Sequence, residues 1–300
     1  MGNGHTTYQP RQLDCGPSTG RVSARALKRD ASATASDPIT ARALGVWSAG
    51  DYDRIAAGFR HEAQAFVERL ELAPGVRVLD AACGSGNLTI PAARTGATVT
   101  GFDLVPAMLD AAAAWGAHEG LTFELDQGTV EELPYDDAQF DVVLSMFGLM
   151  FAARPERVVS ELARVTRPGG RVVLANWTRT GFVGQMLAKH VKYVPPVAGI
   201  PSPLLWGDEP VIRDRFDERA WDVATTPRTL RFRYPYTPAG TAELFRTSYG
   251  PTVRVFEALD EERGGRLAAE LEEHWTSHQL GTGGLTEVDA QYIEVVATRR

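Results

Sequence analysis

Apolar runs of strand length alternate with segments of helical period through the middle of the chain. Five runs have the apolar character of buried strands, and they occupy residues 76–81, 97–102, 121–125, 140–147 and 171–177. Most connections between them are long or helical in period, with helices expected over 87–94, 105–116 and 155–166. Because such connections make right-handed crossovers, the pattern predicts a parallel sheet with helices packed against it.

The N-terminal part of the chain has a different pattern. Residues 1–38 are polar and rich in Gly, Ser, Thr and Arg without a clear period, so we expect a flexible extension. Alternatively, residues 21–29 form a short helix that docks on a partner subunit of a homo-oligomer. From Trp47 to Leu70, large apolar residues recur at helical spacing, which predicts one or two amphipathic helices before Pro74-Gly75.

The regular alternation ends after residue 177. Two further strands are expected over 229–234 and 292–298, and they bring the predicted sheet to seven strands. Helices are expected over 182–194, 209–216 and 237–279, the last interrupted at Gly250-Pro251 and at Gly264-Gly265. The two late strands therefore flank a helical insertion.

Composition and charge narrow the class of protein. The net charge of -7 and the pI near 5.5 argue against nucleic acid as the main partner, because a phosphate-binding surface usually carries a basic excess. Cys15 and Cys83 lack C-x-x-C spacing, which indicates a reducing, cytoplasmic compartment without a zinc site. No apolar stretch reaches the roughly 18 residues of a membrane span, and no secretory signal is apparent. His274 and His278 lack an H-E-x-x-H context, so no metal is expected.

The segment VLDAACGSGN, residues 78–87, carries the most specific chemistry in the chain. A buried strand ends in Asp80, and a glycine-rich turn then opens a helix whose exposed amide groups face a ligand. Gly84 and Gly86 permit a tight turn and close approach of the ligand to the backbone. A dinucleotide site would have a third glycine where Thr89 stands, and Asp80 would repel a pyrophosphate. An acid at this place suits a ligand with a positive ammonium group and a sulfonium.

The next predicted strand ends in Asp103, 17 residues after Gly86. A carboxylate at this position can accept hydrogen bonds from both hydroxyl groups of a ribose. This feature is common to NAD and S-adenosylmethionine sites. It therefore indicates an adenosyl ligand without choosing between the two.

As a set, these motifs resemble those of the class I S-adenosylmethionine-dependent methyltransferases. The pattern is most similar to the C-methyltransferases of ubiquinone and menaquinone biosynthesis and their natural-product relatives, and it covers residues 47–177. The similar segments are VLDAACGSGN, GFDLVPAML, QGTVEELPY, FDVVLSMFGLMF and RPGGRVVLANW. The resemblance implies a Rossmann-like, doubly wound, seven-stranded and mostly parallel sheet with a helical lid insertion, and S-adenosyl-L-methionine as the cofactor.

The resemblance also implies roles for individual residues. Asp80 is expected at the methionine end of the cofactor and Asp103 at the ribose, with Met108 against the adenine. Relatives usually carry an aspartate where Thr129 stands, so the adenine amino group has a weaker acceptor here. The expected cofactor-binding residues are Tyr52, Asp80, Ala81, Gly84, Ser85, Gly86, Asp103, Leu104, Met108, Thr129, Val130, Glu131, Ser145 and Met146.

We expect four regions along the chain. An extension over 1–38 is followed by helices over 39–75 that cover the active site, the cofactor-binding core over 76–177, and the remaining sheet with its lid over 178–300. The lid itself spans about 237–279, and its many aromatic residues are typical of an apolar pocket. The expected acceptor-binding residues are Trp47, Phe147, Phe182, His190, Trp206, Tyr234 and Tyr249.

The methyl acceptor is therefore expected to be an apolar or aromatic small molecule of secondary metabolism. A base is needed only where the acceptor must lose a proton, and no strong base motif appears. One hypothesis is C-methylation of an electron-rich carbon, with aromatic walls that stabilise positive charge and follow-on chemistry such as cyclisation. The alternatives are O- or N-methylation of a small molecule, an NAD-dependent oxidoreductase and a non-catalytic cofactor-binding subunit.

Overall fold

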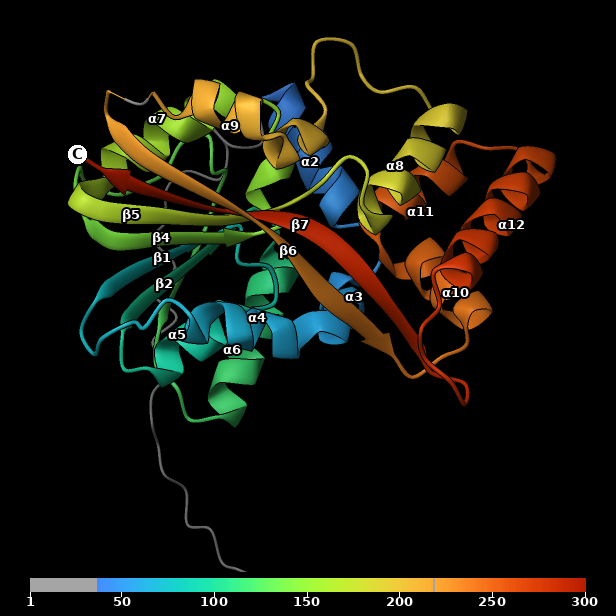
Figure 1. The fold of residues 1–300 in the computed structure, drawn as a ribbon, viewed down its shortest axis with the longest axis horizontal. Helices are drawn as coiled ribbons and strands as arrows, with labels where there is room; N and C mark the ends of the chain where they lie inside the picture. Colours follow the sequence, from blue (N-terminus) through green and yellow to red (C-terminus); the bar gives the residue numbers. More distant parts are fainter. Residues whose placement is uncertain (1–36, 218) are drawn as a thin grey trace, which may run out of the picture.

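The computed structural model describes residues 37–217 and 219–300. The segment 21–29 lies outside the described residues, and so does almost all of the extension for which a docking role was considered. Seven strands form one sheet in the order β3-β2-β1-β4-β5-β7-β6. Helices pack on both faces of this sheet (Figure 1), so the predicted doubly wound α/β fold is confirmed.

The strands divide into a parallel group and an antiparallel pair. The neighbours among the first five strands all pair in parallel; these strands are β1 (Arg77–Ala81), β2 (Thr98–Asp103), β3 (Glu124–Gln127), β4 (Phe140–Met146) and β5 (Thr166–Trp177). Strand β7 (Thr286–Arg299) runs antiparallel to both β5 and β6 (Trp221–Tyr234). The central strands are buried on both faces, which explains their continuous apolar runs.

The helices form two layers and a separate group. Figure 1 shows α4 (Arg60–Glu68), α5 (Thr89–Arg94) and α6 (Pro106–His118) on one face of the sheet. The other face carries α7 (Pro155–Val165) and α9 (Glu209–Arg215). Four helices gather at one end of the molecule: α8 (Phe182–Tyr193), α10 (Pro238–Ser248), α11 (Gly250–Glu257) and α12 (Glu261–Ser277). The shorter elements are α2 (Pro38–Trp47), α3 (Tyr52–Ala56) and the 3-10 turns η1 (Ala57–Phe59), η2 (Leu149–Phe151) and η3 (Pro203–Gly207).

Two predictions about the C-terminal part were wrong in detail. Strands β6 and β7 are much longer than predicted, because they pair with each other in one uninterrupted antiparallel register from Trp221 to Tyr234. Gly264 and Gly265 do not interrupt a helix but lie inside α12. The apolar side of α12 continues past them, where the buried residues are Leu267, Leu271, His274 and Trp275, and its packing offsets the roughly 1 kcal/mol that an interior glycine costs. The break lies instead before Asp260, which caps the helix.

The strand order places an opening at the carboxyl ends of β1 and β4. Strands β2 and β3 lie on one side of β1, whereas β4 and β5 lie on the other. The connections that leave β1 and β4 therefore diverge, and they leave a crevice at that edge of the sheet. Ligands of open α/β sheets bind at such reversal points.

Candidate active site

A cleft of about 1060 Å³, which includes its opening to solvent, lies at the carboxyl ends of β1, β2 and β4. The loops after these strands form its floor, and α2 and α3 cover it. Eleven of the expected cofactor-binding residues line it: Tyr52, Asp80, Gly84, Ser85, Asp103, Leu104, Met108, Thr129, Val130, Glu131 and Met146. Residues that are far apart in sequence are thus brought together as the motifs predicted.

The turn after β1 has a left-handed backbone at several positions. Ala82 and Gly84 have φ angles of 61° and 54°, and both line the cleft. Phe147, which follows β4, has a φ angle of 62° and faces the same cleft. Left-handed conformations are costly for residues with a side chain and cluster at functional sites. The close approach of the two turns supports them, because Gly148 has no room for a Cβ atom beside Ala82.

Asp80 is a buried acid. Its hydrogen-bond partner is Thr89, the residue that stands where a dinucleotide site would have its third glycine. Its carboxylate accepts a hydrogen bond of 2.6 Å from the Thr89 hydroxyl. Burial raises the pKa of Asp80 to about 7, the Thr89 hydrogen bond opposes this, and the nearby Asp103 adds to it. Thr89 therefore holds the acid in place, a role that a glycine could not fill.

Asp103 joins the turns that follow β1 and β2. Its two carboxylate oxygens accept hydrogen bonds from the Gly84 amide at 2.8 Å and the Val105 amide at 2.9 Å. Burial raises the pKa of Asp103, and these amide groups oppose the rise. Each oxygen retains a further lone pair, so the carboxylate can still accept hydroxyl groups of a ligand.

Two polar atoms in the cleft have no hydrogen-bond partner among the described residues. They are the Ser85 hydroxyl and the side-chain oxygen of Asn87, and both are buried. The amide nitrogen of Asn87 donates to the Ala56 carbonyl at 3.1 Å, which fixes the side chain. Because buried polar groups are normally paired, these two atoms and the two acids suit a ligand with a charged amino-acid end and a ribose.

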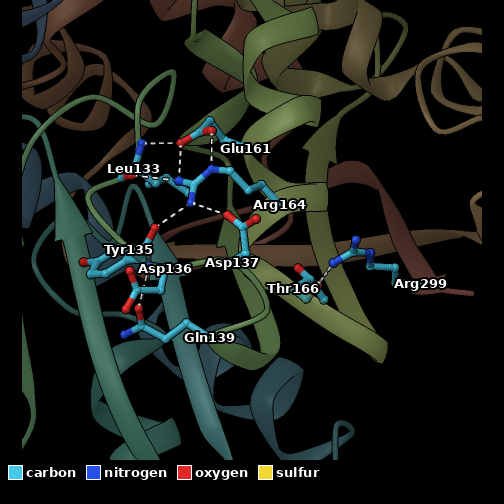
Figure 2. A network of polar contacts seen from close by, with 9 residues as sticks. All are labelled: Leu133, Tyr135, Asp136, Asp137, Gln139, Glu161, Arg164, Thr166 and Arg299. Atoms are coloured by element: carbon cyan, nitrogen blue, oxygen red, sulfur yellow. Dashed lines mark hydrogen bonds and ion pairs between the residues drawn. The ribbon is translucent and has the colours of Figure 1, made fainter.

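The loop after β3 borders the cleft on the side expected for adenine. The Thr129 hydroxyl accepts a hydrogen bond of 3.3 Å from the Glu131 amide and so closes a local turn. Figure 2 shows how α7 holds the following part of this loop. Glu161 accepts from the Leu133 amide at 2.6 Å, and Arg164 donates to the Leu133 carbonyl at 2.9 Å.

The guanidinium group of Arg154 attaches the covering helix α2 to this loop. It pairs with Glu131 at 2.6 Å and with Asp37, the N-terminal cap of α2, at 2.8 Å. The Arg154 guanidinium holds the pKa of Asp37 well below its ordinary value. The side chains of Ile39, Thr40, Ala43 and Trp47 on α2 line the cleft, so this ion pair holds a helix that covers the site.

Replacing Arg154 with methionine is expected to weaken cofactor binding roughly tenfold and to lower the melting temperature. The change frees the start of α2 and leaves the buried Glu131 carboxylate without its guanidinium partner. Calorimetric titration with S-adenosylhomocysteine and a thermal melt measure the two effects. Asp37→Asn releases only α2, so it should weaken binding with a smaller loss of stability. If both variants bound S-adenosylhomocysteine with unchanged affinity, the ion pair would not be what holds α2 over the cleft.

A second, smaller cavity of about 320 Å³, which includes its opening to solvent, adjoins the cleft. Both share the side chains of Trp47, Tyr52, Phe59, Phe147 and Phe151. The remaining walls are Ile55, Trp177, Val183, Met186, Phe232, Phe245 and Tyr249. Of the residues expected to bind the acceptor, Trp47, Phe147 and Tyr249 line this cavity.

Four residues expected to bind the acceptor lie elsewhere. Phe182 stacks on His274 with ring centroids 4.3 Å apart, and His190 contacts the Thr252 hydroxyl at 3.2 Å. Burial lowers the pKa of His190 to about 4, so it is neutral at ordinary pH. Trp206 packs under Arg215, and the Tyr234 hydroxyl donates to the Ile55 carbonyl at 2.8 Å. None of the four lines either cavity.

Three residues expected to bind the cofactor also do not line the cleft. Gly86 allows the turn to pack on α6, since a Cβ atom there would lie 3.2 Å from that of Ala112. Ala81 is fully buried within the sheet. The Ser145 hydroxyl accepts a hydrogen bond from the Leu149 amide at 3.2 Å and so stabilises η2. They contribute to the packing of the strand ends and turns beside the cleft.

Several cleft and cavity residues had no sequence signal of their own. Asn87 closes the glycine motif, and its place directly after Gly86 is the only signal that the sequence offers for it. Phe59, Trp177 and Phe232 are aromatic residues on separate elements, and only the fold brings them together.

Of the histidine pair, His274 lies in α12 and belongs to the core, whereas His278 follows the helix and is partly buried. His274 lies 2.9 Å from the Phe182 carbonyl, and burial lowers its pKa to about 4. Within residues 37–217 and 219–300, no three acids, histidines or cysteines are grouped so as to hold a metal ion. In the same residues, no helix is both long and apolar enough to cross a membrane.

Comparison with known proteins agrees with the geometry. A family model described as a methyltransferase domain matches residues 79–174. The uncharacterized protein Rv1405c of Mycobacterium tuberculosis is 35% identical over 270 residues, which cover 88% of this chain and 93% of that protein. The ubiquinone biosynthesis O-methyltransferase of Maricaulis maris is 37% identical over 107 residues, or 35% of this chain and 42% of that protein.

A solved structure shows the same fold. A putative methyltransferase from Bacillus halodurans has a TM-score of 0.54 at 19% identity, with 78% of this chain and 97% of that chain covered. Together with the motifs and the strand order, these similarities settle the choice between S-adenosylmethionine and NAD that Asp103 alone left open. The chain belongs to the class I S-adenosylmethionine-dependent methyltransferases, and it is an enzyme that methylates small molecules.

Proposed function

We propose that the protein methylates an apolar or aromatic small molecule of secondary metabolism, bound in the smaller cavity beside the cofactor cleft. The observation that supports this most strongly is the shared wall of the two spaces, which includes Trp47, Tyr52 and Phe147. A molecule in the smaller cavity would adjoin the cleft without crossing solvent. The aromatic walls suit a largely apolar acceptor.

The residues of the cleft are proposed to hold the cofactor by complementary charge and shape. Asp80, Ser85 and Asn87 would bind its amino-acid end, and Asp103 would accept the ribose hydroxyl groups. Leu104 and Met108 would pack on the adenine, which the loop carrying Thr129, Val130 and Glu131 would border. When bound, S-adenosylmethionine supplies an activated methyl group. The protein then has to align the reactants and exclude water, which the cover formed by α2 supports.

C-methylation of an electron-rich carbon is the reaction that the smaller cavity favours. Among the described residues that line it, none is an acid, a histidine, a lysine, an arginine or a cysteine. A side-chain base is thus lacking, whereas aromatic faces can stabilise positive charge that develops on the acceptor. Such a cation could also cyclise before it loses a proton.

O-methylation of a hydroxyl group that is already ionised at neutral pH is the second candidate. It too would need no base from the protein. The similarity to the Maricaulis maris O-methyltransferase favours it, although that similarity covers 35% of the chain.

Isotope labelling distinguishes the two reactions. The protein is incubated with S-adenosylmethionine carrying a ¹³C-methyl group and with an apolar extract of the source cells. We expect labelled product whose methyl signal falls in the chemical-shift region of carbon-bound methyl groups. A signal in the region of methoxy groups would show that the reaction is O-methylation and not C-methylation. Transfer only to water-soluble, charged compounds would contradict the apolar acceptor.

A further inference from the structure

Among the described residues, the buried and partly buried tyrosines fall into two groups according to the partners of their hydroxyl groups. Four have a partner within hydrogen-bond distance: Tyr135 with Asp126 at 3.0 Å, Tyr193 with Glu270 at 2.7 Å, Tyr234 with the Ile55 carbonyl at 2.8 Å and Tyr292 with Arg69 at 3.2 Å. Tyr249 is buried and Tyr52 is partly buried, and neither hydroxyl has a partner among the described residues. Both residues line the smaller cavity. A hydroxyl group in a largely apolar wall needs a hydrogen-bond partner, so these two point to a ligand.

Tyr249 is held rigidly at the junction of α10 and α11. Its side chain is almost completely buried, with 5% exposed. The Ser248 carbonyl before it accepts a hydrogen bond of 3.0 Å from the Asp51 amide. Gly250 after it packs so closely on the end of α2 that a Cβ atom would collide with the Val46 carbonyl. Its ring is fixed as well, at 5.8 Å from that of Trp47.

Tyr52 lies where the two spaces meet. It lines both the cleft and the smaller cavity, and its ring centroid is 6.3 Å from that of Tyr249. Burial raises the pKa of both tyrosines, so both phenols keep their protons at neutral pH. Each can therefore donate a hydrogen bond.

The indole side chains among the residues of the cavity wall are also donors. Trp47 and Trp177 line it, and their indole N–H groups have no acceptor within the described part of the chain. An indole N–H only donates. The described residues place no carboxylate in this wall that could bind a cationic amine. The wall is thus matched to oxygen atoms that accept hydrogen bonds.

We propose that the methyl acceptor carries a carbonyl or phenolic oxygen that the hydroxyl groups of Tyr249 and Tyr52 bind as donors. This inference rests on the proposed function, which places the acceptor in the smaller cavity. A phenolic oxygen makes the ring carbons ortho and para to it electron-rich, as C-methylation requires, and a carbonyl oxygen does the same for its α carbon when the compound is in its enol form. Tyr249 is then a specificity-determining residue, because its ring contributes to an apolar wall while its hydroxyl selects for oxygen.

Binding of small aromatic probes tests the proposal. 1-Naphthol, 1-tetralone and 1-methylnaphthalene are titrated into the protein saturated with S-adenosylhomocysteine, and quenching of tryptophan fluorescence is measured. The first probe carries a phenolic oxygen, the second a carbonyl oxygen and the third none. The wild-type protein should bind at least one oxygenated probe about tenfold more tightly than 1-methylnaphthalene. Tyr249→Phe should abolish most of this preference without changing the affinity for 1-methylnaphthalene.

Tyr234→Phe is the matched control. Its hydroxyl is also buried but is bound to the Ile55 carbonyl, so its loss should leave the preference for oxygen unchanged. In thermal melts without ligand, Tyr234→Phe should lower the melting temperature, whereas Tyr249→Phe should not, because its hydroxyl has no internal partner to lose.

The outcomes separate the two proposals. Equal preference for oxygen in the wild type and in Tyr249→Phe would overturn the role of Tyr249 and leave the apolar cavity intact. A lower melting temperature of ligand-free Tyr249→Phe would also overturn it. If none of the three probes binds, the proposed acceptor site fails, and the oxygen-binding role fails with it. Preference for 1-naphthol identifies a phenolic acceptor, and preference for 1-tetralone identifies a carbonyl.

Discussion

Replacing Asp103 with alanine is expected to weaken the binding of S-adenosylhomocysteine by at least about 100-fold. The carboxylate accepts hydrogen bonds from the Gly84 and Val105 amides, at 2.8 and 2.9 Å, and is proposed to accept the ribose hydroxyl groups as well. A hydrogen bond to a charged group contributes about 1.5–3 kcal/mol. The variant loses the bonds to the ligand and also the attachment between the turns after β1 and β2. Calorimetric titration measures the affinity.

Asp126→Asn is the matched control for this experiment. Asp126 is also a buried acid, on the neighbouring strand β3, but it accepts a hydrogen bond from Tyr135 and does not line the cleft. Its replacement should lower stability and leave the affinity within about threefold of the wild type. If Asp103→Ala binds as tightly as this control, Asp103 is not the ribose acceptor.

Replacing Asp80 with asparagine is expected to reduce cofactor affinity and to raise stability at the same time. The side chain is almost completely buried, and burial raises its pKa from 3.8 to about 7. The ionised carboxylate is proposed to bind the ammonium group of the cofactor, so its loss should weaken binding by roughly 10- to 100-fold at pH 8. Stability should rise because the variant no longer has to bury a charge.

The pH dependence of the wild-type protein follows from the direction of this shift. Between pH 3.8 and about 7, Asp80 holds a proton in the folded state but not in the unfolded chain. The contribution of Asp80 to the stability of the ligand-free protein therefore falls as the pH rises through this range, by an amount on the order of a few kcal/mol. The buried His190 and His274, whose pKa values burial lowers from 6.5 to about 4, make a contribution of the opposite sign, which rises with pH up to about 6.5. Cofactor affinity rises with pH, because only the ionised acid attracts the ammonium group. It should be about tenfold higher at pH 8 than at pH 6.

Thermal melts and titrations across this pH range measure both effects. In Asp80→Asn the cofactor affinity should become nearly independent of pH between 6 and 8, apart from the contribution of Asp103, and the remaining change in stability should be the rise that His190 and His274 cause. Thr89→Val is the matched variant, because it removes the hydroxyl group that opposes the raised pKa. The pH at which cofactor affinity is half-maximal should therefore be higher in Thr89→Val than in the wild-type protein. The account would be contradicted if the stability gained by Asp80→Asn relative to the wild-type protein were no larger at pH 8 than at pH 6.

Local patterns along the chain were enough to predict the fold and most of the cleft. The parallel strands are continuous apolar runs because both of their faces are buried. The cleft residues follow the ends of these strands directly, so Asp80, Gly84 and Asp103 could be located by counting from each strand. Once the sheet has formed, the side chains or backbone of these residues line the cleft. Gly86 and Ser145 illustrate the limit: Gly86 packs on α6, and the Ser145 side chain at the end of β4 bonds to the Leu149 amide, so neither lines the cleft.

The acceptor side could not be predicted in the same way. Phe182, Tyr234 and Tyr249 are all large residues in or near the helical insertion, and sequence alone does not distinguish a core side chain from a cavity wall. The difference depends on the partner each side chain meets from a distant element. Tyr234 meets the Ile55 carbonyl, whereas Tyr249 meets no acceptor among the described residues.

The sequence by itself determined the α/β fold and the kind of ligand expected at the carboxyl ends of β1 and β2. Strand period and the turn chemistry of a glycine-rich segment depend on neighbours only a few residues apart. Only the tertiary structure decided which aromatic rings line the smaller cavity and that Arg154 attaches α2 to the loop after β3. Those arrangements join residues that are far apart in the sequence, such as Asp37 and Arg154 or Tyr52 and Tyr249. Contacts between distant elements depend on side-chain packing and ion pairing, and these leave no periodic pattern in the sequence around either partner.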